Sequence, residues 1–366
     1  MSGQLLKKFD QEDRSVIASS GMDDTGKTRS ASFLQEDNKI HFFHALEGGI
    51  DILPIENALD KFPQISDYYG SAFQELGRDF PSDTKGGYFI RVKKGTTVEL
   101  PIQSCLFLKN LGFKQKVHNL VIIEEGARAH LITGCSASRA AAEAHHLGIS
   151  EFFIHKGGYL NFTMIHSWHE DVAVKPMSVA LLDEDASFVS NYICLKPVKE
   201  IVMYPTAVLR GKNSRASFNS LLLTHLGSFQ DIGSRVILKA ENTSAEIIAR
   251  AVSLGGKAVS RGHLKAESKN VKAHLECRGL VINEEGIIHA VPELETDYRD
   301  VEMSHEAAIG KISKEEIEYL CSRGFSYEDA QSIIIRGFMD IEILALPEIL
   351  KKEIKELEDK NLSGSF

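Results

Sequence analysis

The sequence predicts a mainly β fold with a repeated unit, preceded by an N-terminal α/β region and followed by a C-terminal helical region. Three observations support this prediction. Short apolar or alternating segments fill residues 88–310, polar turn residues separate them at intervals of roughly 30 residues, and helix-capping signals follow residue 312. A repeat of about that length suggests a β-solenoid, although periodicity alone does not separate a β-helix from a sandwich.

The N-terminal region, residues 1–87, mixes short helical patterns with loops. Apolar residues recur at near-helical spacing between Ile55 and Leu76, but Pro63 and Gly70 interrupt the pattern. Because proline breaks a helix interior, we expect two short helices here rather than one long helix.

The central region, residues 88–312, is expected to form the repeated β core. Residues 127–132 and 244–249 alternate between apolar and polar side chains, which predicts strands with one buried face. The other strand candidates are short apolar segments at residues 120–123, 152–154, 179–182, 221–223 and 236–238. Turn signals fall near Gly126, Gly157, Asp185, Asn213, Thr243, Asn270 and Glu285.

The C-terminal region, residues 313–366, is expected to be helical. Ser313 with Glu316 forms a capping box, Ser326 with Asp329 gives a similar start signal, and Gly324 stands where a helix would stop. Pro347 is expected to open a last charged helix that ends near Lys360. The predicted apolar faces consist of Ile317, Leu320 and Cys321 in the first helix and of Ala330, Ile333, Ile334 and Phe338 in the second.

Composition argues against several classes of function. The 366 residues carry a formal net charge of -9 with scattered basic residues, which argues against a binder of nucleic acid or of an anionic membrane. No apolar segment is long enough to span a bilayer and no signal peptide is evident, so a cytoplasmic protein is expected. The widely spaced cysteines suggest reduced thiols rather than a local four-cysteine metal motif. They are Cys105, Cys135, Cys194, Cys277 and Cys321.

Residues 21–28 match the phosphate-binding loop pattern Gly-x4-Gly-Lys-Thr. A working loop of this kind follows a buried strand and opens a helix, so that backbone N–H groups face the phosphates. Here the preceding residues are polar, no amphipathic helix follows, and Asp23 and Asp24 would face the phosphates. We therefore expect that this motif does not bind nucleotide.

Two segments near the C-terminus carry most of the chemical information. Residues 275–282 contain Cys277, and residues 303–312 contain His305 and Glu306. Thiolate, imidazole and carboxylate are ligand types that hold iron and other transition metals. Together with the helical tail up to Phe338 and with upstream residues 124–126 and 133–137, these segments resemble the SufB/SufD family of scaffold subunits for iron–sulfur cluster assembly.

The resemblance implies a right-handed parallel β-helix, and a site at a subunit interface where Cys277 accepts sulfur while His305 and Glu306 help to bind iron. On a regular strand, His305 and Glu306 point to opposite faces, so both reach one site only at a bend or an interface. Arg278 would lower the pKa of the Cys277 thiol if it packed close to it. The alternative is that Cys277 is a small buried core residue and that His305 and Glu306 are structural.

Cys135 resembles a SufB cysteine that receives sulfur before passing it on, although a purely structural turn is the alternative. Phe107 and Lys109 depart from the Arg and Asn that the family usually has in the strand before this cysteine. Among the remaining residues, His289 is a secondary candidate, and Cys105, Cys194 and Cys321 are expected to be core residues. The histidines at 145–146 and between 166 and 169 are expected in loops or on the surface, because no third ligand accompanies them.

The resemblance implies a non-enzymatic scaffold, SufB-like at its site residues, that assembles a transient iron–sulfur cluster. It also implies a SufC-type ABC ATPase docked on the C-terminal helices, and either a homodimer or a SufB/SufD-type heterodimer. Flavin binding has no support in the sequence. Two alternatives stay open: a structural SufD-type subunit without its own cluster site, and a β-solenoid enzyme acting on polysaccharide. The single tryptophan, Trp168, and the lack of a paired-carboxylate signature disfavour the enzyme.

Overall fold

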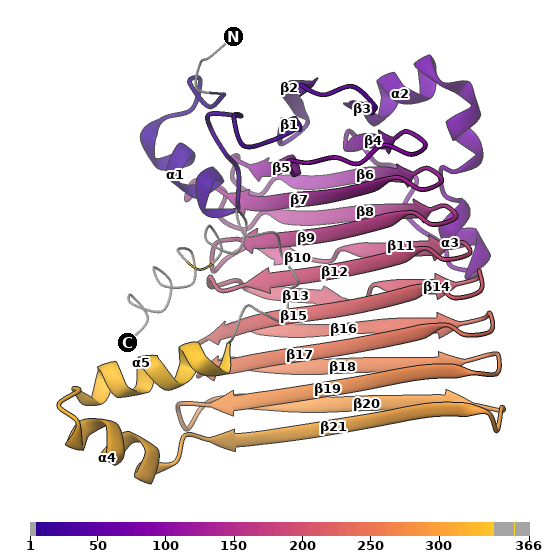
Figure 1. The fold of residues 1–366 in the computed structure, drawn as a ribbon. Coiled ribbons are helices and arrows are strands. Elements are labelled where there is room, and N and C mark those ends of the chain that lie inside the picture. The colour runs from indigo at the N-terminus through magenta and orange to yellow at the C-terminus, as the bar shows by residue number, and fades with distance from the viewer. Residues whose placement is uncertain (1–4, 340–354, 356–366) are drawn as a thin grey trace.

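The computed structural model describes residues 5–339 and residue 355. In this part of the chain, strands wind into a solenoid of about eight turns whose two long sheets face each other (Figure 1). Successive strands of each sheet are mostly parallel, and residues along a strand are in register with residues of the strand in the next turn. The repeated unit therefore builds a parallel β-helix, as the family resemblance implied, and not a sandwich.

The two sheets are named here A and B. Sheet A runs in the spatial order β2 (Lys39–Ala45), β1 (Ala31–Glu36), β5 (Ile102–Leu108), β7 (Arg128–Ala137), β9 (Tyr159–Ser167), β12 (Ser187–Cys194), β15 (Arg215–His225), β17 (Ser244–Leu254), β19 (Val271–Val281) and β21 (Val301–Lys311). Sheet B comprises β3 (Ile50–Pro54), β4 (Tyr88–Val92), β6 (Lys114–Ile123), β8 (His145–Ile154), β10 (Ala173–Val174), β11 (Met177–Leu182), β13 (Glu200–Met203), β14 (Thr206–Leu209), β16 (Phe229–Leu238), β18 (Lys257–Ala266) and β20 (Ile287–Thr296).

Two turns of the coil have a broken strand in sheet B. The breaks fall at Pro176, between β10 and β11, and at Pro205, between β13 and β14. Proline has no N–H to donate, so it interrupts the hydrogen-bonded ladder between neighbouring strands.

The predicted turn signals lie on one edge of the solenoid, where the chain passes from sheet B to sheet A. Gly126, Gly157, Asp185, Asn213 and Asn270 have φ values of 67°, 65°, 57°, 60° and 57°, a left-handed conformation that Gly, Asn and Asp tolerate best. The signal predicted at Thr243 lies one residue after its left-handed residue, Asn242. Glu285 belongs to the opposite edge, between β19 and β20, which explains the short last interval.

Stacked turns on this edge are joined by hydrogen bonds and ion pairs. The N–H of Gly126 donates to the carbonyl of Lys156 at 2.9 Å, and the N–H of Gly157 donates to that of Glu184 at 2.9 Å. The Lys156 and Glu184 side chains also pair at 2.7 Å, 28 residues apart, and an equivalent lysine–glutamate pair 31 residues apart lies on the turn before. Exposed pairs of this kind contribute little individually, so the backbone ladder carries most of the alignment.

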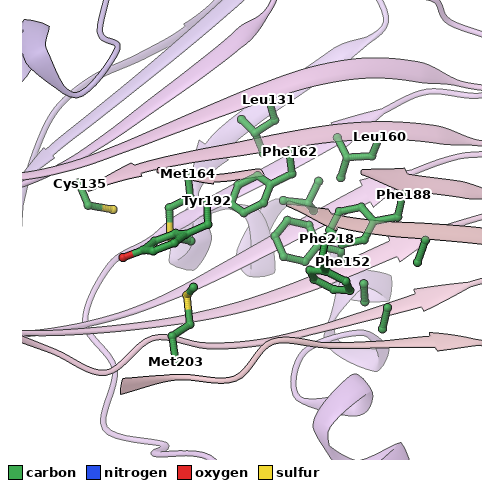
Figure 2. Packing of buried hydrophobic residues seen from close by; sticks show 14 of the residues in the cluster. Leu131, Cys135, Phe152, Leu160, Phe162, Met164, Phe188, Tyr192, Met203 and Phe218 are labelled. Atoms are coloured by element: carbon green, nitrogen blue, oxygen red, sulfur yellow. The ribbon is translucent and has the colours of Figure 1, made fainter. Parts of the chain in front are cut away.

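Apolar side chains fill the space between the two sheets. Phe152 from sheet B and Phe162, Phe188 and Phe218 from sheet A cluster between the sheets in Figure 2, with ring centroids 4.8 Å apart for Phe152 and Phe162 and 5.3 Å for Phe152 and Phe188. Tilted aromatic pairs at these distances add to the stabilisation from burial alone.

Helices cover parts of the outer faces. Helix α1 (Gln11–Ser19) packs on the N-terminal end of sheet A. On sheet B lie α2 (Ile55–Lys61), the 3-10 helix η1 (Pro63–Asp67) and α3 (Ser71–Glu75), so the helical segment is interrupted at Pro63 and Gly70, as predicted.

A buried carboxyl group fixes the last part of this helical cover. Glu151, on the outer face of β8, accepts hydrogen bonds from the N–H of Gly70 at 2.6 Å and of Ala72 at 2.9 Å. The ring of His118 bonds to the same carboxyl group at 2.7 Å, and both side chains are fully buried. Glu151 therefore ties α3 to the sheet.

The tail contains the two helices that were predicted after residue 312. Helices α4 (Lys314–Ser322) and α5 (Tyr327–Phe338) start after Ser313 and Ser326, and Gly324, at φ 98°, lies between them. The Ser326 hydroxyl accepts from the N–H of Asp329 at 3.0 Å, whereas the Ser313 hydroxyl bonds to Glu315 instead of capping the helix.

Two expectations about the tail were wrong. Cys321 is exposed, and in α5 it is Ile335, not Ile333 or Ile334, that is buried against sheet A together with Met339. The helix expected from Pro347 to Lys360 lies outside the described residues, apart from residue 355.

Candidate functional site

The C-terminal end of the β-helix is open. Strands β20 and β21 form its last turn, and within the described residues β21 pairs with β19 on one side only. Side chains that would face the interior are exposed here: Ile309 retains 45% of its surface and Leu294 retains 38%. An open end with exposed apolar residues is typical of a surface that another subunit covers.

Cys277 lies one strand inside this open end. It is on the interior face of β19, only 2% exposed, and the Ser260 hydroxyl donates to its sulfur at 3.5 Å. Burial raises the pKa of the Cys277 thiol, the hydrogen bond from Ser260 lowers it, and the charge of Glu276 raises it further. The thiol is thus protonated at neutral pH and must lose its proton before it binds iron.

Arg278 does not activate this thiol. It points to the outer face, where its guanidinium pairs with Glu276 at 3.1 Å and with Glu306 at 3.5 Å. The expectation that Arg278 lowers the pKa of Cys277 was conditional on close packing, which the alternation of the strand prevents.

His305 and Glu306 lie on β21, on opposite faces as expected for a regular strand. His305 is in register with Leu275, so it shares the interior face with Cys277. Spacings within and between strands put the Cα atoms of Cys277 and His305 about 8 Å apart. Glu306 is in register with Glu276 and faces outward, next to Arg278.

The three residues therefore do not close a metal site within one chain. Among the described residues, no group of three or more His, Cys, Asp or Glu side chains has the geometry to hold a metal ion. Cys277 and His305 share one face, while Glu306 approaches them only around the open edge of β21.

Cys135 occupies a different part of the interior. It is 2% exposed on the inner face of β7, on the side of the core where Tyr192, Met164 and Met203 lie (Figure 2). Burial raises the pKa of the Cys135 thiol well above its usual range. Four strands of sheet A separate β7 from β19, so Cys135 and Cys277 are about 24 Å apart.

Sequence reasoning missed the surroundings of Cys135. His166 is in register with Cys135 and with Cys194, and both His166 and His146 are buried beside Trp168 rather than lying in loops. Burial lowers the pKa of His146 to about 3 and lowers that of His166 as well, so both rings are neutral. The alternation of Leu160, Phe162 and Met164 continues to His166 and was the available signal.

The other candidates lie elsewhere. Phe107 and Lys109 contact the N-terminal segment, since Lys109 pairs with Asp13 at 2.8 Å and the Phe107 ring packs on Phe9. They do not line the interior beside Cys135. His289 alternates with the interior residues Ile288 and Ala290 of β20 and so faces outward. Cys105 and Cys194 are buried, as expected.

In the phosphate-loop-like motif, a carboxylate of the motif itself accepts hydrogen bonds from the loop. The Asp23 carboxylate accepts from the N–H groups of Thr25 at 2.9 Å and Thr28 at 3.2 Å and from both of their hydroxyls. Residues 21–30 then lead into strand β1 rather than a helix. The backbone donors are thus already used, which supports the expectation that the motif does not bind nucleotide.

Comparison with known proteins identifies the family. Residues 107–338 match the family described as SUF system FeS cluster assembly, SufBD core domain. A SufBD family protein of Archaeoglobus fulgidus is 44% identical over 99% of this chain and 100% of its own length, and one of Methanothermobacter thermautotrophicus is 40% identical over 98% and 90%. SufB of Bacillus subtilis is 30% identical over 77% of this chain and 61% of its own length.

No helix in the described part of the chain is long and apolar enough to cross a membrane. The family match covers most of the coil, and the two archaeal relatives align with 98–99% of this chain. The chain belongs to the SufBD family of iron–sulfur cluster assembly proteins.

Proposed function

We propose that this chain is a SufB-like scaffold that accepts sulfur on Cys277 and assembles a transient iron–sulfur cluster with His305 and Glu306 where two subunits meet. The observation that carries the proposal is the open last turn, with Cys277 and His305 on one face, one strand from an unpaired edge. A second subunit on this end would exclude water and complete the ligand set, as thiolate and imidazole ligands require for iron.

Cys135 acts in this proposal as an earlier sulfur acceptor. Transfer of a terminal persulfide sulfur to a thiolate forms one S–S bond, breaks another and leaves the donor as a thiolate, so it needs no outside oxidant or reductant. The gap of about 24 Å between Cys135 and Cys277 excludes direct transfer, so an intermediate carrier is required. On the interior face, the register partners of Cys277 on the preceding strands of sheet A are Ala249, then Ser220, then Tyr192.

The partners follow from the exposed surfaces. The open end supports a homodimer or a heterodimer of SufB/SufD type, and reduced thiols are consistent with work in the cytoplasm. The proposed docking surface for a SufC-type ABC ATPase consists of the exposed aromatic side chains Tyr319 on α4, Phe325 in the loop after it and Tyr327 on α5. Exposed aromatic groups are typical of protein interfaces.

Anaerobic reconstitution tests the cluster site. Wild type loaded with ferrous iron and sulfide should develop the absorption and Mössbauer signature of a cluster, and Cys277→Ser should lose it while circular dichroism stays unchanged. Cys321→Ser is the matched control, because it removes an exposed thiol on α4, outside the interior of the β-helix that holds Cys277. Full loading of Cys277→Ser would contradict the proposal. A wild type that loads only when mixed with a SufB partner would favour the structural SufD-type role.

A titration tests the ATPase surface. Tyr327→Asp should weaken binding of the purified ATPase in isothermal calorimetry, because the residue is 58% exposed and its loss leaves the fold intact. Phe338 is a poorer choice, since it packs against sheet A and its carbonyl accepts from Arg250 at 3.1 Å. Leu226→Asp, on a remote exposed turn, is the control. Unchanged binding of the ATPase by Tyr327→Asp would show that the ATPase docks on another surface.

A further inference from the structure

Two arginines meet on the outer face of sheet B where the helical cover ends. Arg78 follows α3 and donates from Nη1 to the Thr206 hydroxyl at 3.2 Å. Thr206 on β14 is the register partner of Arg235 on the adjacent parallel strand β16, so their Cα atoms are about 5 Å apart. Arg235 faces outward, as does Ile237 two residues further along the strand. The two guanidinium groups therefore share one small area of the surface.

Neither guanidinium is neutralised by a carboxylate. Thr206 is the partner of Arg78, and the buried Nε of Arg235 has no hydrogen-bond partner among the described residues. Burial lowers the pKa of Arg78, and the neighbouring charge of Arg235 lowers it further. Two like charges, half-buried and close together, cost free energy unless an anion lies between them.

Two acidic side chains on the same face are paired with other cations. Asp231 holds Arg261 through two hydrogen bonds of 2.6 and 2.9 Å. Glu75, at the end of α3, pairs with Arg210 at 3.3 Å and with Lys239 at 3.4 Å. Glu293, whose charge acts on Tyr204 and Arg261, lies 4.0 Å from the His263 ring. In the described part of the chain, no carboxylate forms an ion pair with Arg78 or Arg235.

A tyrosine supplies a third donor beside the two arginines. The strand break at Pro205 leaves Tyr204 on the outer face, with its ring lying on Gly233: a Cβ at Gly233 would come within 2.5 Å of the ring. Besides Glu293, the charges that act on Tyr204 are those of Arg235, Arg261 and Arg78, and its hydroxyl has no hydrogen-bond partner in the described residues. Glycine at position 233 is what lets the ring lie flat there.

We propose that Arg78, Arg235 and Tyr204 form a binding site for a phosphate group, free or as the ester of a larger molecule. The planar guanidinium presents paired N–H donors that match phosphate oxygens, and a phenol adds a neutral donor. The site is a local concentration of positive charge in a chain of net charge -9. It lies on the sheet opposite the one that carries Cys277, so it is separate from the cluster site.

Calorimetry and thermal denaturation of the full chain test this site. Titration with inorganic phosphate, glycerol phosphate and adenosine monophosphate, against sodium chloride at equal ionic strength, separates a free ion from an ester. We expect saturable binding and a raised melting temperature with at least one of these probes. Arg78→Gln and Arg235→Gln should each weaken that binding about tenfold, because each removes a charge-assisted contact.

Two further variants make the result decisive. Arg128→Gln removes the same charge at a remote exposed position and should leave phosphate binding unchanged. Arg235→Glu supplies an internal carboxylate for Arg78, so it should raise the melting temperature in phosphate-free buffer and abolish the response to phosphate. The proposal is overturned if wild type binds none of the probes, if Arg128→Gln weakens binding as much as Arg235→Gln, or if Arg235→Glu is destabilised.

Discussion

Glu151 should control the attachment of the helical cover to sheet B. Glu151→Ala removes the acceptor of three buried hydrogen bonds, from Gly70, Ala72 and His118. Leaving a buried group of such a network without its partner costs about 3–5 kcal/mol. Because α3 has only five residues, it has little helical stability of its own, so the loss should appear as local opening of the cover.

Hydrogen exchange followed by mass spectrometry measures this effect directly. Amide protons of residues 65–76 in Glu151→Ala should exchange faster by roughly 10²- to 10^3.5-fold, which is what about 3–5 kcal/mol of local stability represents. Strands β15 and β17, on the other sheet, should exchange as in wild type. Glu184→Ala, which breaks an exposed pair with Lys156, is the control and should change little. Equal exchange of residues 65–76 in Glu151→Ala and wild type would refute the reasoning.

Three other predictions concern the N-terminal loop and the open end. Lys27→Ala should leave nucleotide affinity of the isolated chain unchanged in a fluorescence titration, and a large loss would show that the loop does bind nucleotide. Hydrogen bonds from Thr28 and Thr25 outweigh burial and hold the pKa of Asp23 below its ordinary value of 3.8. Asp23 therefore contributes its full stabilisation at a pH above the ordinary pKa, and this contribution is lost as the pH falls through the lower pKa of the folded state. Acid denaturation of Asp23→Asn should lack this pH-dependent loss of stability. Identical denaturation profiles for Asp23→Asn and wild type would contradict the prediction. Ile309→Lys should dissociate the proposed dimer in sedimentation velocity, because it adds a charge to the exposed apolar end, and an intact dimer would exclude this interface.

Local chemistry explains which parts of the fold could be predicted. The left-handed residues Asp185, Asn213 and Asn270 mark turns through their own backbone preference, so their spacing was visible without any tertiary information. The same is true of the serine at the start of α5, whose hydroxyl caps a backbone N–H three residues away.

Features set by the opposite sheet or by a neighbouring element could not be predicted in this way. The alternation through Phe162 and Met164 puts His166 on the inner face of its strand, but its burial depends on sheet B, which closes over it. Cys321 is exposed because only one side of α4 faces the rest of the chain, whereas its helical position suggested a core residue.

The candidate site was predictable in part. The opposite orientations of His305 and Glu306 follow from the two-residue period of a strand, and the structure has them so. Their relation to Cys277 depends on the register that pairs Leu275 with His305 and Cys277 with Ala307, which pattern alone does not give. In the proposed function, a second subunit completes the site, so neither the sequence nor one subunit contains all of it.

The constant register of the turns restricts how the length of this protein can change. Inserting one residue within a strand such as β15 would exchange its interior and exterior side chains and put its polar residues among the phenylalanines. Inserting a complete turn of 28 to 31 residues would preserve the alternation, the left-handed turn and the backbone ladder on both sides. Viable length variants in the coil should therefore differ by whole turns, and smaller insertions should be confined to the loops at its two edges.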